Sequence, residues 1–225
     1  MTTLQNIKYR LLSKIPGRIG RRYYRKYRRR TAVMRFNAAL PWISGLASID
    51  LGANVGEFTR LMAEHSREVI AFEPDPWTSE RLRSNLLDLP NVRIIQAAAS
   101  TTTGIAKLYR HSEFQKSPVV NSKSSSLFKG KTNVTSDGSI DVEQIDFLSF
   151  LRNLDCDIGI IKIDIEGAEV DILERLLSED DLLKRILFIF VETHEKKLPE
   201  QADRVAALHE KVKHIRSPKI DLYWR

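Results

Sequence analysis

The chain has 225 residues, 42% hydrophobic and 29% charged, which is enough apolar material for one folded domain and excludes a wholly disordered or collagen-like chain. Its single cysteine, Cys156, excludes an intrachain disulfide and a cysteine-rich metal site. No apolar run approaches the roughly 18 residues of a membrane-spanning helix, and the N-terminus lacks a signal-peptide core. We therefore expect a folded cytoplasmic protein.

The charge is distributed unevenly along the chain. Residues 1–48 contain twelve Lys or Arg and no Asp or Glu, whereas the whole chain has 36 basic and 29 acidic residues. The sequence therefore predicts a basic, helical N-terminal extension over residues 1–45 and a mildly acidic domain over 46–225. In the extension, apolar residues at positions 4, 7, 11 and 15 have the spacing of an amphipathic helix, which Pro16 ends.

From Ala47 onward, short apolar runs alternate with longer segments of helical periodicity. This alternation predicts an α/β fold with helices on a mostly parallel, doubly wound sheet. Strands are expected at 47–51, 68–72, 92–96, 158–163 and 186–191, and helices at 56–65, 77–87, 147–154, 168–177 and 201–212. Such sheets bind ligands at the carboxyl ends of their strands, so the functional site is expected there.

The pattern breaks between residues 111 and 139, in a segment rich in Ser, Lys, Asn and Gly. It is too long for an ordinary connection, so it is either functional or a solvated loop. Its hydroxyl, amide and amino groups are of the kind that contact a polyol: Asn121, Ser122, Lys123, Ser124, Ser125 and Ser126.

The turn after the first strand has the features of a cofactor site. Gly52 and Gly56 bracket it and allow close backbone approach to a ligand. Glu73, which ends the second strand 23 residues after Asp50, suits both hydroxyls of a ribose.

The turn lacks the glycine pattern of dinucleotide sites and the Lys-Ser/Thr of a P-loop. The carboxylate of Asp50 would repel a pyrophosphate but complement the two cations of S-adenosylmethionine, which we predict as the cofactor. The alternative is a structural turn in which Asp50 and Asn54 cap the next helix.

Four segments in sequence order resemble the signatures of FkbM-type S-adenosylmethionine-dependent methyltransferases. They are Asp50–Gly56, Phe72–Pro76, Lys162–Glu169 and Val191–His194. The resemblance covers about residues 47–195 and implies a Rossmann-like class I methyltransferase fold and O-methylation, often of a sugar or polyketide. This fold usually ends in an antiparallel strand pair, whereas the sequence offers one terminal strand, Lys219–Trp224.

The resemblance also implies roles for individual residues. Glu73 would bind the ribose, with Asp75 nearby, and Asn85 would have a structural role in the second helix. The methionine end of the cofactor would be lined by Asp50, Gly52, Asn54 and Gly56.

Charged residues gather where the fourth and fifth predicted strands end. Period-two alternation places Lys162, Asp164 and Glu166 on one side of the chain, and the next strand leads into His194. A hydroxyl must lose its proton to accept a methyl group, so a base is expected. His194 and Asp164 are equal candidates, Glu166 is a third, and Lys162 would orient a carboxylate or stabilise an alkoxide.

The same residues also have structural interpretations. Lys162 with a carboxylate would be an ion pair, Glu166 and Glu169 would begin a helix, and His194 would be a loop residue. Mg²⁺ or Ca²⁺ bound by Asp164, Glu166 and His194 is chemically reasonable. The spacing is not diagnostic of a metal site, so we predict no metal.

Arginine and tyrosine are interleaved over Arg21–Arg30. Such a segment binds an anionic membrane surface, a phosphorylated acceptor or, with Tyr23, Tyr24 and Tyr27 stacking on bases, RNA. The alternative is a solvated helix face.

Three functions therefore stay open. The first is O-methylation of a carbohydrate, glycolipid or related natural-product acceptor. The second is RNA methylation, which is disfavoured because the sequence has no Asn/Asp-Pro-Pro-Tyr motif and no catalytic cysteine arrangement. The third is a non-catalytic binding module.

Overall fold

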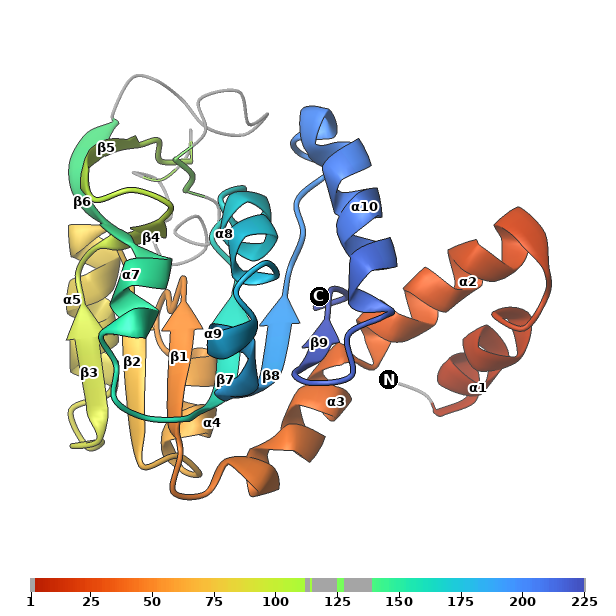
Figure 1. The fold of residues 1–225 in the computed structure, drawn as a ribbon, viewed down its shortest axis with the longest axis horizontal. Coiled ribbons are helices and arrows are strands. Elements are labelled where there is room, and N and C mark those ends of the chain that lie inside the picture. Colours follow the sequence, from red (N-terminus) through yellow and green to blue (C-terminus); the bar gives the residue numbers. More distant parts are fainter. Residues whose placement is uncertain (1–2, 112–113, 115–124, 128–138, 225) are drawn as a thin grey trace.

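The computed structural model describes residues 3–111, 114, 125–127 and 139–224 (Figure 1). Its centre is a parallel sheet in the order β3-β2-β1-β7-β8-β9. The strands are β1 (Ala47–Leu51), β2 (Glu68–Phe72), β3 (Val92–Ile95), β7 (Ile158–Ile163), β8 (Ile186–Val191) and β9 (Lys219–Asp221). The predicted α/β fold with a mostly parallel sheet is confirmed, because buried apolar runs form the strands.

Helices cover both faces of this sheet (Figure 1). One face carries α7 (Phe147–Arg152), α8 (Glu169–Leu176), α9 (Asp180–Lys184) and α10 (Ala202–Val212), with η3 (Pro199–Gln201) before α10. The other carries α3 (Ala32–Ala39), η1 (Leu40–Ile43), α4 (Glu57–Ala63) and α5 (Pro76–Asn85). Each face has its own apolar core, so the sheet is doubly wound as predicted.

A second, smaller sheet lies near the carboxyl end of the main sheet (Figure 1). Its strands are β4 (Ala98–Ser100), β5 (Gly104–Leu108) and β6 (Ile140–Asp146), in the order β4-β6-β5. β6 pairs parallel with β4 and antiparallel with β5. The sequence did not predict these strands, because β4 is short and most residues of β5 and β6 are not buried.

The C-terminal segment completes the edge of the main sheet. β9 pairs in parallel with β8, and the antiparallel pair that usually ends this fold is not found among the described residues. Trp224 follows it and is buried against the rings of Phe36, Phe58 and Phe190, with centroid distances of 5.0, 4.8 and 5.7 Å. This aromatic cluster joins the chain end to α3 and α4.

The N-terminal part forms a hairpin of α1 (Thr3–Leu12) and α2 (Gly17–Arg30), which projects from the sheet (Figure 1). After it, Ala32, Phe36 and Ile43 are fully buried in the core beneath the sheet. The division at residue 45 stays a prediction, and packing alone would place a boundary nearer to Thr31. Within the described part of the chain, no helix is long and apolar enough to cross a bilayer.

Candidate active site

A cavity opens at the carboxyl ends of β1, β2 and β7. Together with the open solvent at its mouth, it encloses about 890 Å³ of space. Its walls come from the β1–α4 turn, the end of β2, the end of β7 and the second sheet. The lining residues are Gly52, Ala53, Asn54, Val55, Glu57, Phe58, Phe72, Glu73, Pro74, Ala97, Ala98, Ala99, Leu108, Ser125, Leu127, Lys162, Asp164, Ile165 and Glu166.

The β1–α4 turn brings bare backbone to the cavity. Gly52 has φ +78°, and a Cβ there would lie 1.9 Å from the carbonyl oxygen of Asp164, so only glycine fits. Asn54, with φ 51°, continues the left-handed turn. Asn85 donates from Nδ2 to the carbonyl oxygen of Val55 at 2.8 Å, which secures the turn against the end of α5.

Gly56 and Asp75 lie behind this wall and do not line the cavity. Gly56 packs under α5, where a Cβ would lie 2.8 Å from Leu82 Cδ1. Asp75 caps α5 by accepting from the backbone N–H groups of Trp77 and Thr78, and it pairs with Arg110 at 2.6 Å. The geometry therefore gives both residues a supporting position.

Glu73 lies in the wall and faces the cavity. One carboxylate oxygen accepts the N–H of Asn54 at 2.9 Å, and the other accepts the N–H of Asp75 at 3.1 Å. Burial raises the pKa of Glu73 to about 8, although these two hydrogen bonds act in the opposite direction. The carboxyl group is held rigidly at the edge of the glycine turn, as a ribose site requires.

Asp50 does not reach the cavity, contrary to the simplest interpretation of the sequence. Its carboxylate pairs with Lys162 Nζ at 2.9 Å and accepts the hydroxyl of Thr59 at 2.7 Å. The two charged side chains are 1% and 4% exposed. The charge of the Asp50 carboxylate is already balanced by Lys162. Asp50 therefore supports the turn from beneath and does not line the space in which a cation would bind.

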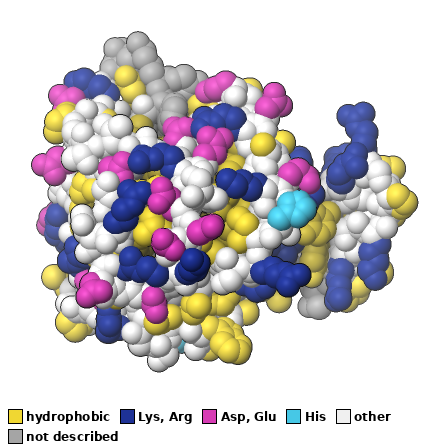
Figure 2. Space-filling view, viewed as in Figure 1, with side chains coloured by type: hydrophobic (Ala, Val, Ile, Leu, Met, Phe, Trp, Pro, Cys, Tyr) yellow, Lys and Arg dark blue, Asp and Glu magenta, His cyan; other side chains and the backbone are white. Residues whose placement is uncertain are grey.

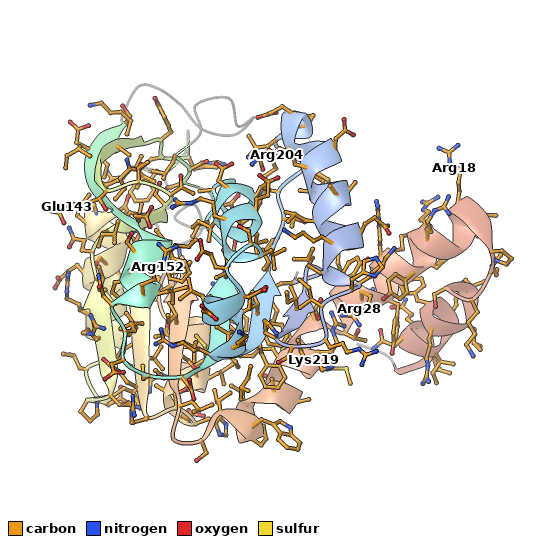
Figure 3. The ribbon with its side chains drawn as sticks, in the orientation of Figure 1. Arg18, Arg28, Glu143, Arg152, Arg204 and Lys219 are labelled. Carbon is orange, nitrogen blue, oxygen red and sulfur yellow. The ribbon has the colours of Figure 1, made fainter. Side chains whose placement is uncertain are left out.

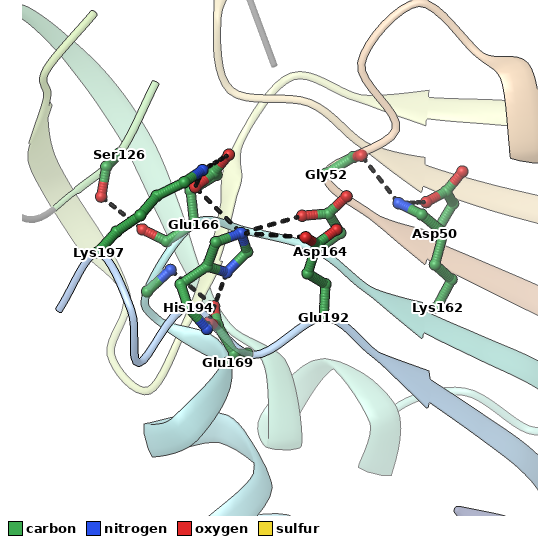
Figure 4. Close-up of polar contacts among 11 residues, drawn as sticks. Asp50, Gly52, Ser126, Lys162, Asp164, Glu166, Glu169, Glu192, His194 and Lys197 are labelled. Carbon is green, nitrogen blue, oxygen red and sulfur yellow. Dashed lines mark hydrogen bonds and ion pairs between the residues drawn. The ribbon is translucent and has the colours of Figure 1, made fainter. Parts of the chain in front are cut away.

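Lys162 also donates to the carbonyl oxygen of Gly52 at 3.1 Å, so it joins β7 to the glycine turn (Figure 4). Burial opposes its charge, but the carboxylate of Asp50 outweighs burial and the pKa of Lys162 is raised. Of its two predicted roles, the geometry favours orienting a carboxylate over stabilising an alkoxide.

Beyond Asp164, the ends of β7 and β8 converge on His194 (Figure 4). Its Nδ1 lies 2.8 Å from Glu169, and its Nε2 lies 3.1 Å from Glu166, 3.8 Å from Asp164 and 4.0 Å from Glu192. The sequence prediction that Asp164, Glu166 and His194 lie together agrees with this geometry, whereas Lys162 faces the other way, toward Asp50.

The crowded charges shift the pKa values of this cluster. Burial opposes the imidazolium, but the hydrogen bond and charge of Glu169, with the charges of Glu166 and Asp164, outweigh burial and raise the pKa of His194 to about 9. Burial and the neighbouring charge of Asp164 raise the pKa of Glu192 to about 7. Burial also raises the pKa of Asp164, against the opposing charges of Lys162 and His194.

Glu166 occupies a strained position, with φ 56°. Its carboxylate pairs with Lys197 Nζ at 3.1 Å, and its backbone oxygen accepts the hydroxyl of Ser126 at 2.6 Å. Left-handed backbone at a non-glycine residue is costly and is concentrated at functional sites.

Two of the residues in the 111–139 segment that were predicted to contact an acceptor lie in the described part. Ser125 lines the cavity, and the hydroxyl of Ser126 donates to the carbonyl oxygen of Glu166. The others lie outside the described residues: Asn121, Ser122, Lys123 and Ser124.

A metal could be shared by Asp164, Glu192 and His194, whose ligand atoms lie within 4.8 Å of one another. However, both ring nitrogens of His194 already face carboxylates. With no ion present, these carboxylates raise the pKa of His194 and favour the doubly protonated ring, which donates at both nitrogens. The absence of a metal stays a prediction.

Sequence reasoning gave no active-site role to Glu169 and Glu192. Glu169 is fully buried, and besides the ring of His194 it accepts the N–H of His194 at 3.1 Å and that of Gly167 at 2.7 Å. The two-residue spacing of Glu192 and His194 was an available signal for Glu192. Glu169 gave no such signal, because its partner is 25 residues away in the chain.

The parallel sheet, the glycine turn and the ribose-type carboxylate together define a Rossmann-like class I methyltransferase fold. The model of the methyltransferase FkbM domain matches residues 50–217. The chain therefore belongs to the FkbM methyltransferase family, as its motifs predicted.

Two curated relatives are also methyltransferases. "Methyltransferase 1" of Beauveria bassiana is 28% identical over 159 residues, which cover 62% of each chain. "Hexuronic acid methyltransferase AglP" of Haloferax volcanii is 25% identical over 147 residues, which cover 64% of this chain and 54% of the relative. The matched regions thus span less than two thirds of these relatives.

Among solved structures, an rRNA methylase from Streptococcus thermophilus aligns with a TM-score of 0.44 and 11% identity. The alignment covers 81% of this chain and 79% of that one.

Proposed function

We propose that the protein is an S-adenosylmethionine-dependent O-methyltransferase that acts on a hydroxyl of a carbohydrate, glycolipid or related natural-product acceptor. The observation that carries this proposal is one cavity with a ribose-type carboxylate, Glu73, at one end and a base-type carboxylate, Asp164, at the other. Family membership supports methyl transfer. The relative that is a hexuronic acid methyltransferase supports a carbohydrate acceptor.

The residues present fit this cofactor. Glu73 would accept hydrogen bonds from the ribose hydroxyls, and the backbone from Gly52 to Val55 would lie against the methionine part, with Asp50 holding the turn through Lys162. S-adenosylmethionine, when bound, supplies a methyl group on a positively charged sulfonium. The carboxyl groups of the cavity wall, when ionised, favour a cation and disfavour a diphosphate.

Asp164 is the proposed base. It lines the cavity directly after β7, its side chain is 27% exposed, and its raised pKa makes it a stronger base than an ordinary carboxylate. The acceptor hydroxyl would give its proton to an Asp164 oxygen as its own oxygen forms the new bond to the methyl carbon. His194, which is 4% exposed, would lie behind Asp164 and serve as the cation that balances the surrounding carboxylates.

Glu166 and Lys197 would then position the acceptor side of the site. Their ion pair lies at its edge, with Lys197 partly exposed. Carboxylate and ammonium groups at a rim suit the hydrogen-bonding hydroxyls of a sugar.

The test is transfer of a labelled methyl group into extracted glycan, lipid and RNA fractions, with calorimetric titration of S-adenosylhomocysteine alongside. We expect S-adenosylhomocysteine to bind and the label to enter glycan or glycolipid. Asp164→Asn should bind S-adenosylhomocysteine normally but lose transfer, with the exposed Asp203→Asn as the matched control.

The two other functions make different predictions in this assay. Label in the RNA fraction alone would establish an RNA methyltransferase. Binding of S-adenosylhomocysteine without transfer into any fraction would favour a binding module, and failure to bind would reject the cofactor assignment.

A further inference from the structure

A basic hollow lies between α2 and the segment that follows β8. We define it by its lining residues: Arg18, Arg21, Arg22, Arg25, Lys26, Arg29, Glu195 and Lys196. The six residues from α2 recur every three or four positions, so they form one face of the helix. Figure 2 shows Lys and Arg side chains over the projecting hairpin, and Figure 3 places Arg18 at its far end.

The charges of the basic hollow are poorly balanced. It has seven cationic residues and one carboxylate, Glu195, which lies 3.8 Å from Arg29. Arg18, Arg21, Arg22 and Arg25 form no ion pair with any residue that the structure describes. Like charges on one helix face repel one another, and a bound anion would relieve this repulsion.

The basic hollow adjoins the candidate active site through a tight turn. Glu195 follows His194 directly, and the carbonyl oxygen of His194 accepts the N–H groups of Lys197 and Leu198 at 2.8 and 3.0 Å. Within this turn, Lys197 pairs with Glu166 in the active site, whereas Lys196 lines the basic hollow.

The order of the strands shows how the candidate active site and the basic hollow lie along the edge of the main sheet. Along the rim the order is β2 with Glu73, β1 with Gly52, β7 with Asp164 and β8 with His194. β9 is the strand beyond β8, and the basic hollow lies at this edge of the sheet, between α2 and the residues that follow β8. An acceptor whose hydroxyl reaches Asp164 from this side would place its remaining part toward the basic hollow.

The tyrosines of α2 are not arranged to stack on nucleic acid bases in the basic hollow. The ring of Tyr23 packs on Tyr9 of α1, with centroids 5.8 Å apart, and the ring of Tyr24 packs on Tyr223, 5.6 Å apart. None of these rings lines the basic hollow. Outside residues 1–48 the chain has more acidic than basic residues, which disfavours an extended basic track for an RNA strand.

The geometry points to a phosphate-binding site in the basic hollow, which holds a phosphate group of the acceptor while the acceptor hydroxyl is methylated next to Asp164. This inference rests on the proposed function. Arginine suits phosphate because its planar guanidinium donates two parallel hydrogen bonds to one anion. A phosphate monoester carries more charge than a uronate carboxylate, which matches the excess of cations. The phosphate can belong to a soluble molecule or to a lipid headgroup.

The test is calorimetric titration of the full chain with inorganic pyrophosphate at low ionic strength. The variant Arg22→Gln with Arg25→Gln removes two charges from the basic hollow. The matched control, Lys8→Gln with Arg10→Gln, removes two charges from exposed positions of α1. We expect the first variant to weaken pyrophosphate binding at least about tenfold and the control to change it less than about twofold. Equal weakening in both, or no binding by the unmodified chain in this and the vesicle assay, would overturn the inference.

Further measurements distinguish a lipid source of phosphate from a soluble one, and phosphate binding from RNA binding. Sedimentation with phosphatidylcholine vesicles, with and without phosphatidic acid, tests a lipid source: binding that requires phosphatidic acid and is lost only in the Arg22/Arg25 variant supports it. Single-stranded RNA that binds and is not displaced by pyrophosphate would overturn the inference. Titration with S-adenosylhomocysteine should be the same for all variants, so a failed cofactor site and a failed phosphate site give different results.

Discussion

The ionisation of Glu73 should control cofactor affinity. Its pKa is about 8 in the free protein, so at pH 7 most molecules carry the neutral acid. Ribose hydroxyls donate hydrogen bonds and therefore prefer the ionised carboxylate. Binding should lower the pKa of Glu73 and release a proton, and each pH unit below 8 should weaken affinity about tenfold, or about 1.4 kcal/mol.

The assay is calorimetric titration of S-adenosylhomocysteine from pH 6 to 8.5. The unmodified chain should bind more tightly as the pH rises, whereas Glu73→Gln should bind about 10- to 100-fold more weakly than the chain at pH 8.5 and show no such slope. Glu68→Gln, at the partly exposed start of the same strand, is the matched control and should keep the slope. A flat profile for the unmodified chain, or the same slope in Glu73→Gln, would refute the assignment of Glu73.

Four other predictions follow from the site. Asp164→Asn should lower methyl transfer at least about 100-fold with S-adenosylhomocysteine affinity within about twofold, and normal turnover would reject Asp164 as the base. Lys162→Met leaves the buried carboxylate of Asp50 unpaired and should cost about 3 kcal/mol of unfolding free energy in urea titration; full stability would show that the ion pair is not needed. Gly52→Ala forces a Cβ against the carbonyl of Asp164, so S-adenosylhomocysteine binding should be lost, while the two methyl groups added by Ala106→Val, on the second sheet, should be tolerated. Dialysis against EDTA should leave methyl transfer unchanged because His194 balances the carboxylates, and activity that Mg²⁺ alone restores would contradict this.

The main sheet was predictable because four of its strands are short, mostly buried runs rich in apolar residues. β1, β2, β7 and β8 begin and end at the predicted residues. The second sheet was not predictable, because β5 pairs through its backbone with β6, more than thirty residues away, and contributes one buried residue, Leu108. Local hydrophobic pattern carries no information on such a pairing.

The sequence predicted where the site residues lie on the sheet, but not which residues they contact. Motif spacing placed Glu73, Asp164, Glu166 and His194 at the correct edge of the sheet. The partner of Asp50 depends on the register between β1 and β7, where Asp50 lies opposite Lys162. That register joins residues 112 positions apart, so the sequence alone assigned the charge of Asp50 to the cofactor.

The central claim is that one cavity holds the cofactor between Glu73 and Asp164. A crystal structure of the chain with S-adenosylhomocysteine tests it most directly. We predict that both ribose hydroxyls lie within hydrogen-bond distance of Glu73 and that the sulfur lies at the cavity end formed by Gly52 and Asp164. A ligand bound elsewhere, or a ribose that does not contact Glu73, would contradict the claim.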